Sequence, residues 1–424
     1  MNATPTHRST CRLCDSTRVE IVVELAPIPL AEKYVTADQL SAEPELYPID
    51  LYMCRNCGHV QILDVIDPDY LWKDYTYQSG QTKDIVDHFE SIADKVVSRF
   101  QPKPGGLVVD IGSNDGSLLR PFQSRGLRVL GIDPAREIAL KATASGIETL
   151  PELMTFERAQ QIRKERGPAS IVTAFNVFAH ADDMAGMAES VREMLASNGV
   201  FVFEVRYLLD IIDHMLLGNI VHEHLCHHSV KPLVKFLKRH GLELIDVERV
   251  GIERGLVVTV QKAGGPYPVA PSVGQMLALE TQRQLDQPQT LRAFSTRLRV
   301  LKRQAQTLIA DWKQQGKTVA GYGAARSGPT LIAQLGLEGA IQYVLDDDPQ
   351  KVGKYTPGHH IPVVAAAELD KRMPDYTILL AWTHAERIIA DHRDYLERGG
   401  HFVNCCPEIQ IVSATGRMAS THAA

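Results

Sequence analysis

The sequence predicts an α/β protein in which two Rossmann-like domains follow a small zinc-knuckle domain. Two closely spaced pairs of cysteines near the N-terminus indicate the zinc knuckle. Two separate stretches, residues 105–122 and 318–334, each have the pattern of a buried strand, a glycine-rich turn and a helix, with which a Rossmann-like unit begins. A length of 424 residues suffices for roughly two to three domains of ordinary size.

The expected domain limits follow from these patterns and from one linker. We expect the zinc-binding domain at residues 1–68, the central domain at 69–265, the second Rossmann-like domain at 266–412 and a disordered tail at 413–424. The Gly- and Pro-rich segment "AGGPYPVAPSVG" separates the two Rossmann-like domains. The amphipathic stretch "LRAFSTRLRVLKRQAQTLIADWKQQG" predicts a long helix that joins them.

The cysteine pairs have the spacing of a metal site. Cys11 and Cys14 form "CRLC", and Cys54 and Cys57 form "CRNCG". Two residues between thiolates let both sulfurs reach one ion about 2.3 Å away, and four thiolates close a tetrahedral zinc shell. A site with no open position is structural, so we expect a structural zinc; a redox pair is the alternative.

Composition and charge narrow the class of protein. Hydrophobic residues make up 44% of the chain and charged residues 23%, as in a soluble globular protein, and the formal net charge is −6. The net charge argues against a large basic surface for nucleic acid. No apolar run approaches the roughly 20 residues that span a bilayer, and the N-terminus lacks a secretory pattern. We expect a cytoplasmic protein without nucleic-acid or membrane partners.

The glycine loop of the central domain predicts a cofactor site. A buried strand ends at Asp110, a loop with Gly112, Asn114 and Gly116 follows, and the next strand ends at Asp133. A carboxylate beside the loop would repel the diphosphate of NAD but suits the cationic aminoacyl end of S-adenosylmethionine (SAM). Asp133 is placed to bind the two ribose hydroxyls. We therefore favour SAM, with NAD as the alternative, because a glycine loop alone is weak evidence.

Polar side chains gather where the later strands of this domain end. Asn176, His180 and Glu204 lie at or just beyond such ends, where open α/β sheets bind ligands, and "NIVHEHLCHHSV" (219–230) follows directly. The metalloprotease pattern H-E-x-x-H fails there, because Cys226 occupies the fifth position. The histidines of this stretch therefore lie at the mouth of the predicted cofactor site, where a catalytic metal is disfavoured, and His227 and His228 are expected to be solvated loop residues.

Two further segments have local patterns that leave their role open. "YLWKDYTYQSGQT" (70–82) by itself predicts a strand end or loop with two half-buried tyrosines. "TVAGYGAARSG" (318–328) and the strand "IQYVLDDDP" resemble a nucleotide-binding half, which suits a phosphorylated ligand at the helix start. A Rossmann-like domain kept for packing alone is the alternative.

Taken in order, these motifs resemble those of the sugar C-methyltransferases of deoxysugar biosynthesis. The resemblance covers nearly the whole chain and rests on "CRLC…CRNCG", "DYTYQSG", "DIGSNDGSLL", "NVFAHADD", "HEH", "GYGAARSG" and "DDDPQKVGKYTPGHHIPV". It implies a zinc-binding domain, a central SAM methyltransferase domain and a C-terminal Rossmann-like domain. Such enzymes methylate a nucleotide-linked 4-keto-deoxysugar, typically at C3, so the implied partner is a dTDP-type keto-sugar bound between the second and third domains.

The resemblance also implies residue roles, and with them that residues 219–230 form a catalytic loop. His224 is the expected general base, oriented by Glu223 and supported by His222, because an imidazole titrates near neutral pH. His180 and one tyrosine, Tyr75 or Tyr77, would hydrogen-bond the enolate oxygen. The expected cofactor-binding set is Asp110, Gly112, Asn114, Gly116, Asp133 and Asn176. The expected substrate-binding set is Tyr75, Tyr77, Ser79, Tyr322, Arg326, Asp346, Lys351 and His359.

The sequence departs from the family pattern in three places. Val221 stands where a tyrosine is frequent, "ERGL" (253–256) replaces a His-Gly-Gly-Ser turn, and Arg326 and Ser327 lie where the glycine turn commonly has lysine. These departures leave two other functions open: conversion of the keto-sugar by isomerisation or cyclisation without methyl transfer, and a catalytically silent binding protein. An RNA methyltransferase is disfavoured by the acidic charge balance. We expect a monomer or dimer.

Overall fold

The N-terminal region is a small β-structure built around the four cysteines. The computed structural model describes residues 4–72, 77–251 and 255–419. An antiparallel sheet has the order β11-β4-β3-β2, and its edge strand β11 comes from the central domain. The elements of this region are β1 (Thr6–His7), β2 (Val19–Val23), η1 (Ala37–Gln39), β3 (Leu51–Cys54), β4 (Val60–Ile62), β5 (Asp64–Val65) and α1 (Pro68–Trp72).

The central domain is a seven-stranded sheet in the order β12-β13-β10-β9-β6-β7-β8. Its strands are β6 (Leu107–Ile111), β7 (Arg128–Ile132), β8 (Thr149–Leu150), β9 (Ala169–Phe175), β10 (Leu195–Val205), β12 (Leu242–Arg249) and β13 (Leu256–Lys262). Strands β6 to β10 run parallel, whereas β13 pairs antiparallel with both β10 and β12. All five residues of β6 are buried, as in a parallel strand covered on both faces.

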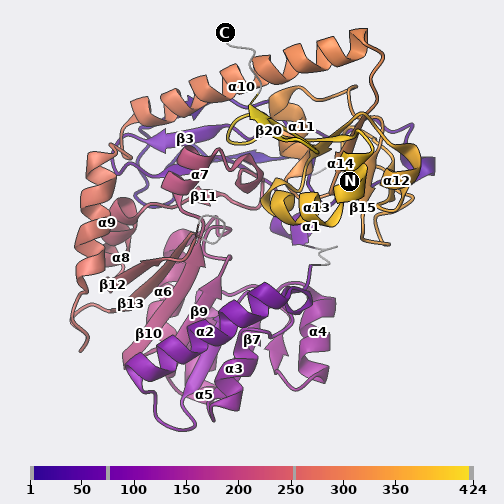
Figure 1. Ribbon diagram of the computed structural model, residues 1–424. Helices are drawn as coiled ribbons and strands as arrows, with labels where there is room; N and C mark the ends of the chain where they lie inside the picture. Colours follow the sequence, from indigo (N-terminus) through magenta and orange to yellow (C-terminus); the bar gives the residue numbers. More distant parts are fainter. Residues whose placement is uncertain (1–3, 73–76, 252–254, 420–424) are drawn as a thin grey trace.

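Helices and short segments complete the central domain. They are η2 (Ser79–Gln81), α2 (Lys83–Phe100), α3 (Leu119–Ser124), α4 (Arg136–Ala144), α5 (Phe156–Arg166), α6 (Met184–Met194), α7 (Leu208–His214), η3 (Leu217–Asn219), β11 (Cys226–His227) and α8 (Val230–Arg239). In Figure 1 the sheet of this domain and helices α2 to α5 form the lower half of the molecule, with α2 and α3 in front of the sheet, whereas α7 and β11 lie in the upper half.

Two helices connect the central and C-terminal domains, α9 (Pro271–Gln282) and α10 (Pro288–Gln314). The buried side chains of α10 recur every three or four residues, which is the pattern that predicted this helix. The helix crosses the top of the molecule in Figure 1, above β3, and packs on β2 and on α11. It therefore joins the N-terminal sheet to the C-terminal domain.

The C-terminal domain is a second α/β unit, with the strand order β16-β15-β14-β17-β18-β19-β20. Its strands are β14 (Val319–Tyr322), β15 (Val344–Asp346), β16 (Val363–Ala365), β17 (Tyr376–Leu379), β18 (His401–Asn404), β19 (Gln410–Ser413) and β20 (Gly416–Ala419). Its helices are α11 (Gly328–Leu335), α12 (Glu368–Arg372), η4 (Trp382–His384), α13 (Ala385–Asp391) and α14 (Arg393–Glu397). The predicted fold class, two Rossmann-like domains after a cysteine-knuckle region, is confirmed.

The expected disordered tail is wrong for its first residues. Strand β20 pairs antiparallel with β19, from Ser413↔Gly416 to Gln410↔Ala419. A short reversal lets the chain add a strand to the sheet edge, where its backbone N–H and C=O groups find partners that water would otherwise supply.

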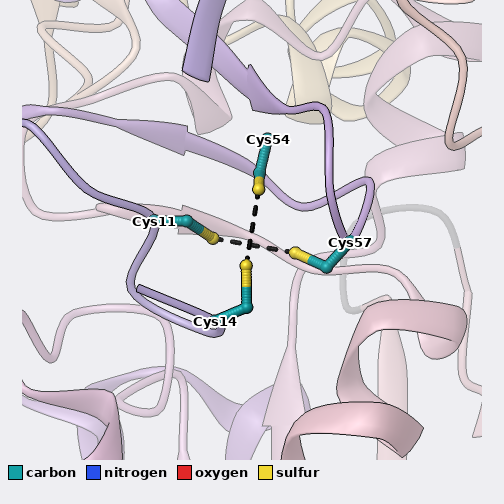
Figure 2. A group of neighbouring side chains, drawn as sticks. All are labelled: Cys11, Cys14, Cys54 and Cys57. Carbon is teal, nitrogen blue, oxygen red and sulfur yellow. Dashed lines mark hydrogen bonds between the residues drawn. The ribbon is translucent and has the colours of Figure 1, made fainter. Parts of the chain in front are cut away.

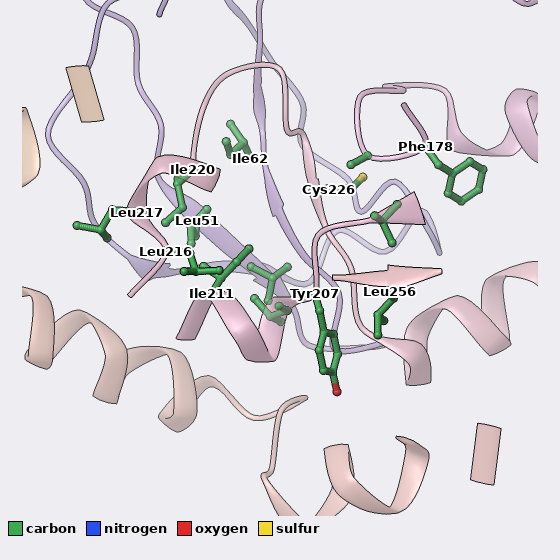
Figure 3. Close-up of a cluster of buried hydrophobic side chains, with 14 of the residues drawn as sticks. Leu51, Ile62, Phe178, Tyr207, Ile211, Leu216, Leu217, Ile220, Cys226 and Leu256 are labelled. Atoms are coloured by element: carbon green, nitrogen blue, oxygen red, sulfur yellow. The ribbon is translucent and has the colours of Figure 1, made fainter. Parts of the chain in front are cut away.

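A continuous hydrophobic core joins the zinc-bearing sheet to the central domain. Leu51 and Ile62 of that sheet lie with Ile211 of α7 and with Leu217 and Ile220 beyond it in one buried cluster (Figure 3). Burying one such side chain is worth about 1.5–3 kcal/mol, so burial of Leu217 and Ile220 anchors the start of the histidine-rich stretch 219–230. No helix in the described part of the chain is both long and apolar enough to cross a membrane.

Candidate active site

The four predicted metal ligands come together. The sulfur atoms of Cys11, Cys14, Cys54 and Cys57 lie within 4.8 Å of one another and point toward a common centre (Figure 2). The Sγ atoms of Cys11 and Cys57 are 3.7 Å apart, and those of Cys14 and Cys54 are 3.5 Å apart. A tetrahedral zinc with bonds of about 2.3 Å requires sulfur separations near these values, so the site fits structural zinc.

A cavity of about 640 Å³ opens at the carboxyl ends of β6, β7, β9 and β10. That volume suits a nucleoside-sized ligand. Its wall includes the predicted residues Tyr77, Ser79, Gly112, Asn114, Asp133, Asn176 and His180. Phe89, Ile132, Met154 and Phe156 add apolar surface against which a flat adenine ring can pack. The chemistry of the lining therefore fits SAM.

The glycine loop and Asp133 form one hydrogen-bonded unit. One carboxylate oxygen of Asp133 accepts from the backbone N–H of Asn114 at 2.8 Å, and the other accepts from Ala135 at 2.8 Å. Gly112 has a φ of +71°, and a Cβ there would lie 2.2 Å from Cγ2 of Val177. Glycine is required at this turn because any side chain would collide. Burial raises the pKa of Asp133.

Two members of the predicted cofactor set lie behind the loop and do not line the cavity. Asp110 is 3% exposed and accepts a hydrogen bond from Thr173 Oγ1 at 2.6 Å. Burial raises the pKa of Asp110 to about 7. At Gly116 a Cβ would lie 2.8 Å from Ile147, so this glycine allows close packing. Both residues therefore support the loop from within.

The deeper wall of the cavity carries a carboxylate and a guanidinium. Glu204 is 2% exposed, lies 2.5 Å from Nε2 of His88 and accepts from Nδ2 of Asn176 at 3.3 Å. Arg206 lines the same cavity two residues further along the chain. A ligand that carries both positive and negative groups would meet side chains of the opposite charge here.

The histidine-rich stretch spans the space between the C-terminal domain and the zinc-bearing sheet. At one end a Cβ on Gly218 would lie 2.4 Å from Ser327, and Thr330 donates to the carbonyl of Ile220 at 3.1 Å. At the other end β11 pairs with β4. The C-terminal domain and the zinc-bearing sheet therefore both fix this loop.

Three aromatic rings stack at the edge of the cavity. The ring centroids of His180 and His224 are 5.2 Å apart with an interplanar angle of 17°. Trp72 stacks on the other side of His180 at 5.3 Å, and both Trp72 and His180 line the cavity. Burial lowers the pKa of His180 well below its ordinary value and lowers the pKa of His224 to about 4. Both rings are therefore neutral near pH 7.

The two residues before His224 occupy different surroundings. His222 is buried, with Nε2 donating to the carbonyl of Tyr47 at 3.3 Å, and burial lowers its pKa. A carboxylate oxygen of Glu223 lies 3.9 Å from Nη1 of Arg326. Val221 is 1% exposed, and its backbone carbonyl accepts a hydrogen bond from the N–H of His224 at 3.0 Å. His222 thus supports the loop, whereas Glu223 faces the C-terminal domain.

The expectation that His227 and His228 are solvated is wrong. They are 1% and 0% exposed, because β11 pairs with β4 on one side and His228 forms a backbone bridge with Tyr207 of the central domain. Burial lowers the pKa of His227 to about 3 and that of His228 to about 4. The His228 ring packs between His59 and Phe178. Both are core residues.

The tyrosine segment reaches the cavity in part. The side chain of Tyr77 is 41% exposed and lines it, and the N–H of Ser79 donates to Oδ1 of Asn114 at 2.9 Å. The segment therefore lies across the glycine loop. Tyr75 lies outside the described residues, as do Glu253 and Arg254 of the "ERGL" turn.

The residues predicted from the C-terminal domain gather at its own glycine turn, and among the described residues none of them lines the 640 Å³ cavity. Asp346 accepts from the N–H of Ala324 at 2.6 Å, and Lys351 donates to the carbonyl of Ala324 at 3.0 Å. Tyr322 is 5% exposed and forms a hydrogen bond with His392 at 2.8 Å. His359 is partly buried in a separate turn, and burial lowers its pKa. Of these predicted residues, Arg326 reaches the histidine-rich stretch, through Glu223.

Sequence reasoning missed three residues of the site. Arg206 follows Glu204 by two residues, just after the end of β10, so the period of two along this strand could have found it. His88 lies on the buried side of the amphipathic helix α2, but a single histidine on such a face carries no signal of its own. Trp72 reaches His180 only through tertiary contact, and no local pattern indicates it.

Comparison with protein-family models divides the chain into three matched parts. A zinc-binding domain model matches residues 11–72, a methyltransferase domain model matches residues 86–247, and a C-methyltransferase C-terminal domain model matches residues 255–407. The first two matches contain the cysteine cluster and the glycine loop, and the third contains the second glycine turn.

The chain is also similar to individual proteins. C-methyltransferase NovU of Streptomyces niveus is 34% identical over 406 residues, which covers 95% of this chain and 97% of NovU. A ubiquinone biosynthesis O-methyltransferase of Burkholderia mallei is 24% identical over 161 residues, covering 35% of this chain and 68% of that protein. The solved structure of magnesium protoporphyrin IX methyltransferase from Synechocystis with bound SAM is 15% identical, with a TM-score of 0.33, and covers 46% of this chain and 89% of that one.

Proposed function

This chain belongs to the family of SAM-dependent C-methyltransferases, and we propose that its acceptor is a nucleotide-activated 4-keto-deoxysugar, methylated at the carbon next to the ketone. The observation that carries this proposal is the stack of His180 and His224 beside the cavity. Carbon methylation next to a ketone requires a base that is unprotonated at working pH, and burial lowers the pKa of His224 to about 4, which keeps its imidazole in that form.

In the proposed reaction, Asp133 and the loop around Asn114 hold the ribose and the methionine part of SAM, and Glu204 and Arg206 face its charged groups. When bound, SAM supplies an electrophilic methyl group that an enolate carbon takes, leaving neutral S-adenosylhomocysteine. The chain has to create that enolate and hold it in line.

His224 is the proposed base. Its Nδ1 donates to the carbonyl of Asn219, so Nε2 of the neutral ring can take the proton from the carbon next to the ketone. His180 and Tyr77 are the proposed donors to the enolate oxygen. Glu223 then stabilises the imidazolium that forms on His224, since its negative charge raises the pKa of His224.

We propose that the nucleotide contacts the C-terminal domain near its glycine turn. Lys351 and Arg326 supply positive charge there, and Asp346 fixes the turn through Ala324. We also propose that Tyr322, Ser79 and His359 contact the sugar nucleotide. Of these residues, Arg326 also contacts the catalytic loop, at Glu223. A nucleotide bound at Arg326 therefore affects Glu223 through this contact.

The test is incubation with methyl-labelled SAM and a panel of dTDP-4-keto-deoxysugars, followed by mass spectrometry. The expected result is one added labelled methyl group on a sugar. Sugar turnover without label would instead favour isomerisation or cyclisation, a candidate suggested by Val221 where a tyrosine is frequent. Absence of any change in all sugars, with SAM bound, would favour a binding protein.

A further inference from the structure

The first cysteine knuckle contains a buried arginine. Arg12 lies between Cys11 and Cys14, and its side chain is 0% exposed. Its Nη1 donates to the carbonyl of Ile62 at 2.5 Å and to Oε1 of Gln61 at 3.2 Å. Its Nε donates to a carboxylate oxygen of Asp182 at 2.9 Å. Burying a guanidinium is costly unless its donors are bonded, so the contacts of Nη1 and Nε determine where Arg12 can lie, whereas Nη2 is buried without a partner among the described residues.

One group of contacts leads from Arg12 to the catalytic loop. Gln61 and Ile62 belong to β4, which pairs with β11 through Cys226↔Gln61. The N–H of Ile62 also donates to the carbonyl of Leu225 at 2.9 Å. Leu225 directly follows His224. The strand that Arg12 contacts, β4, is therefore the strand that pairs with β11 of the catalytic loop.

The other contact leads to the cavity wall. Asp182 lines the cavity and follows His180 by two residues. The carbonyl of Ala179, just before His180, accepts from the N–H of Cys226 at 3.0 Å. Arg8 reaches the same turn from the surface, donating to the carbonyl of Asp182 at 3.1 Å. Residues 179–182, here called the His180 turn, are thus held by the first cysteine knuckle through Asp182 and by β11 through Ala179.

The second knuckle provides a natural comparison. Arg55 occupies the same position in "CRNC" that Arg12 occupies in "CRLC". The Arg55 side chain is 42% exposed and pairs with Glu20 at 3.5 Å. A zinc knuckle therefore does not itself require a buried arginine at this position. The burial of Arg12 serves the surroundings into which the first knuckle packs.

We propose that Arg12 is a positioning residue that couples the zinc site to the cofactor cavity. Zinc fixes the turn from Cys11 to Cys14, the turn fixes Arg12, and Arg12 fixes Asp182 and with it the His180 turn. Coupling between two sites is reciprocal, so SAM in the cavity should tighten zinc binding, and zinc should tighten SAM binding. This inference rests on the proposed placement of SAM in the cavity and not on the identity of the sugar.

The test measures zinc affinity by competition with a chelator, with and without saturating SAM, in the full-length protein and without any sugar. In the wild type and in Arg55→Gln, SAM should raise zinc affinity by about tenfold. In Arg12→Gln the effect should fall below about twofold, and the Kd for SAM, measured by calorimetry on zinc-loaded protein, should rise. Arg55→Gln is the matched control because it alters the equivalent position.

Asp182→Asn removes the ion pairs of Asp182 with Arg12 and with Arg8 while leaving the contacts of Arg12 with Gln61 and Ile62 in place, so it decides the question if Arg12→Gln fails to fold. Loss of the SAM effect on zinc in Asp182→Asn supports the proposal. The same SAM effect in Asp182→Asn as in the wild type overturns it, as does a wild type whose zinc affinity is indifferent to SAM. Asp133→Asn separates the two proposals. If this variant binds SAM as tightly as the wild type, the placement of SAM in the cavity is wrong. If Asp133→Asn binds SAM more weakly but Asp182→Asn keeps the effect of SAM on zinc affinity, only the role of Arg12 is rejected.

Discussion

The Nδ1 atom of His224 donates a hydrogen bond to the backbone carbonyl of Asn219 at 2.7 Å. A carbonyl oxygen can only accept, so the ring proton of neutral His224 lies on Nδ1, and Nε2 keeps a free lone pair. Burial lowers the pKa of His224 to about 4, so this tautomer dominates at neutral pH. The fold thus presents a proton acceptor next to the stacked ring of His180.

Replacing His224 with Gln should remove the proton acceptor while keeping a polar side chain. We expect methyl transfer to fall at least about 100-fold, because a positioned general base is worth roughly that much or more. Solvent deuterium exchange at the carbon next to the ketone should be lost with it, while SAM affinity is unchanged. His384→Gln, at an exposed position, is the control. Exchange at the wild-type rate in His224→Gln would show that another group is the base.

Replacing Glu223 with Gln should shift the pH profile in a defined direction. The negative charge of Glu223 raises the pKa of His224, opposing the larger effect of burial. Without that charge the pKa of His224 falls further, so the acid limb of kcat/KM should move to lower pH. The weaker base should also lower the plateau rate. An acid limb that moves to higher pH would contradict this assignment.

Replacing Asp133 with Asn should weaken SAM binding. The carboxylate is held by two backbone N–H groups and lines the cavity, so the expected loss is a charge-assisted contact with the ribose. Such a contact is worth about 1.5–3 kcal/mol, which corresponds to roughly a 10- to 100-fold rise in Kd by calorimetry. The exposed neighbour Glu137, changed to Gln, should keep wild-type affinity.

Removal of one zinc ligand should abolish zinc binding and destabilise the N-terminal region. Cys54→Ser should yield protein without zinc by elemental analysis and with a lower melting temperature, because zinc binding contributes directly to folding. Cys226→Ser alters a buried thiol outside the cluster and should retain one zinc per chain. Full zinc occupancy in Cys54→Ser would show that the four-thiolate site is not the metal site.

The buried histidines should make the protein sensitive to acid. The pKa of His228 is about 4 in the folded state, below the ordinary value of 6.5. As pH falls from 6.5 toward 4, only the unfolded chain gains this proton, so stability is lost over that window, by about 3 kcal/mol for this residue. His228→Gln should therefore flatten the decline of the unfolding free energy, measured by denaturant titration at several pH values. His384→Gln should leave the slope unchanged.

Several features of this protein follow from local patterns in the sequence alone. The spacing of Cys11, Cys14, Cys54 and Cys57 determines a tetrahedral site, because the reach of two thiolates around one ion is a short-range constraint. The apolar run before Gly112 gave the bounds of β6, since a strand buried on both faces has a distinctive composition. The three-part α/β architecture was predictable for the same reason.

Other features depend on which distant residues meet. Arg12 and Arg55 have the same local context, yet only the packing against Asp182 and β4 buries the first. His227 and His228 look like loop residues until β11 inserts beside β4. The sequence by itself therefore determined the three-part fold class, the grouping of the four cysteines and the glycine loop. Tertiary structure alone decided which polar side chains lie in the cavity and which lie in the core, because burial is set by long-range packing that local patterns do not encode.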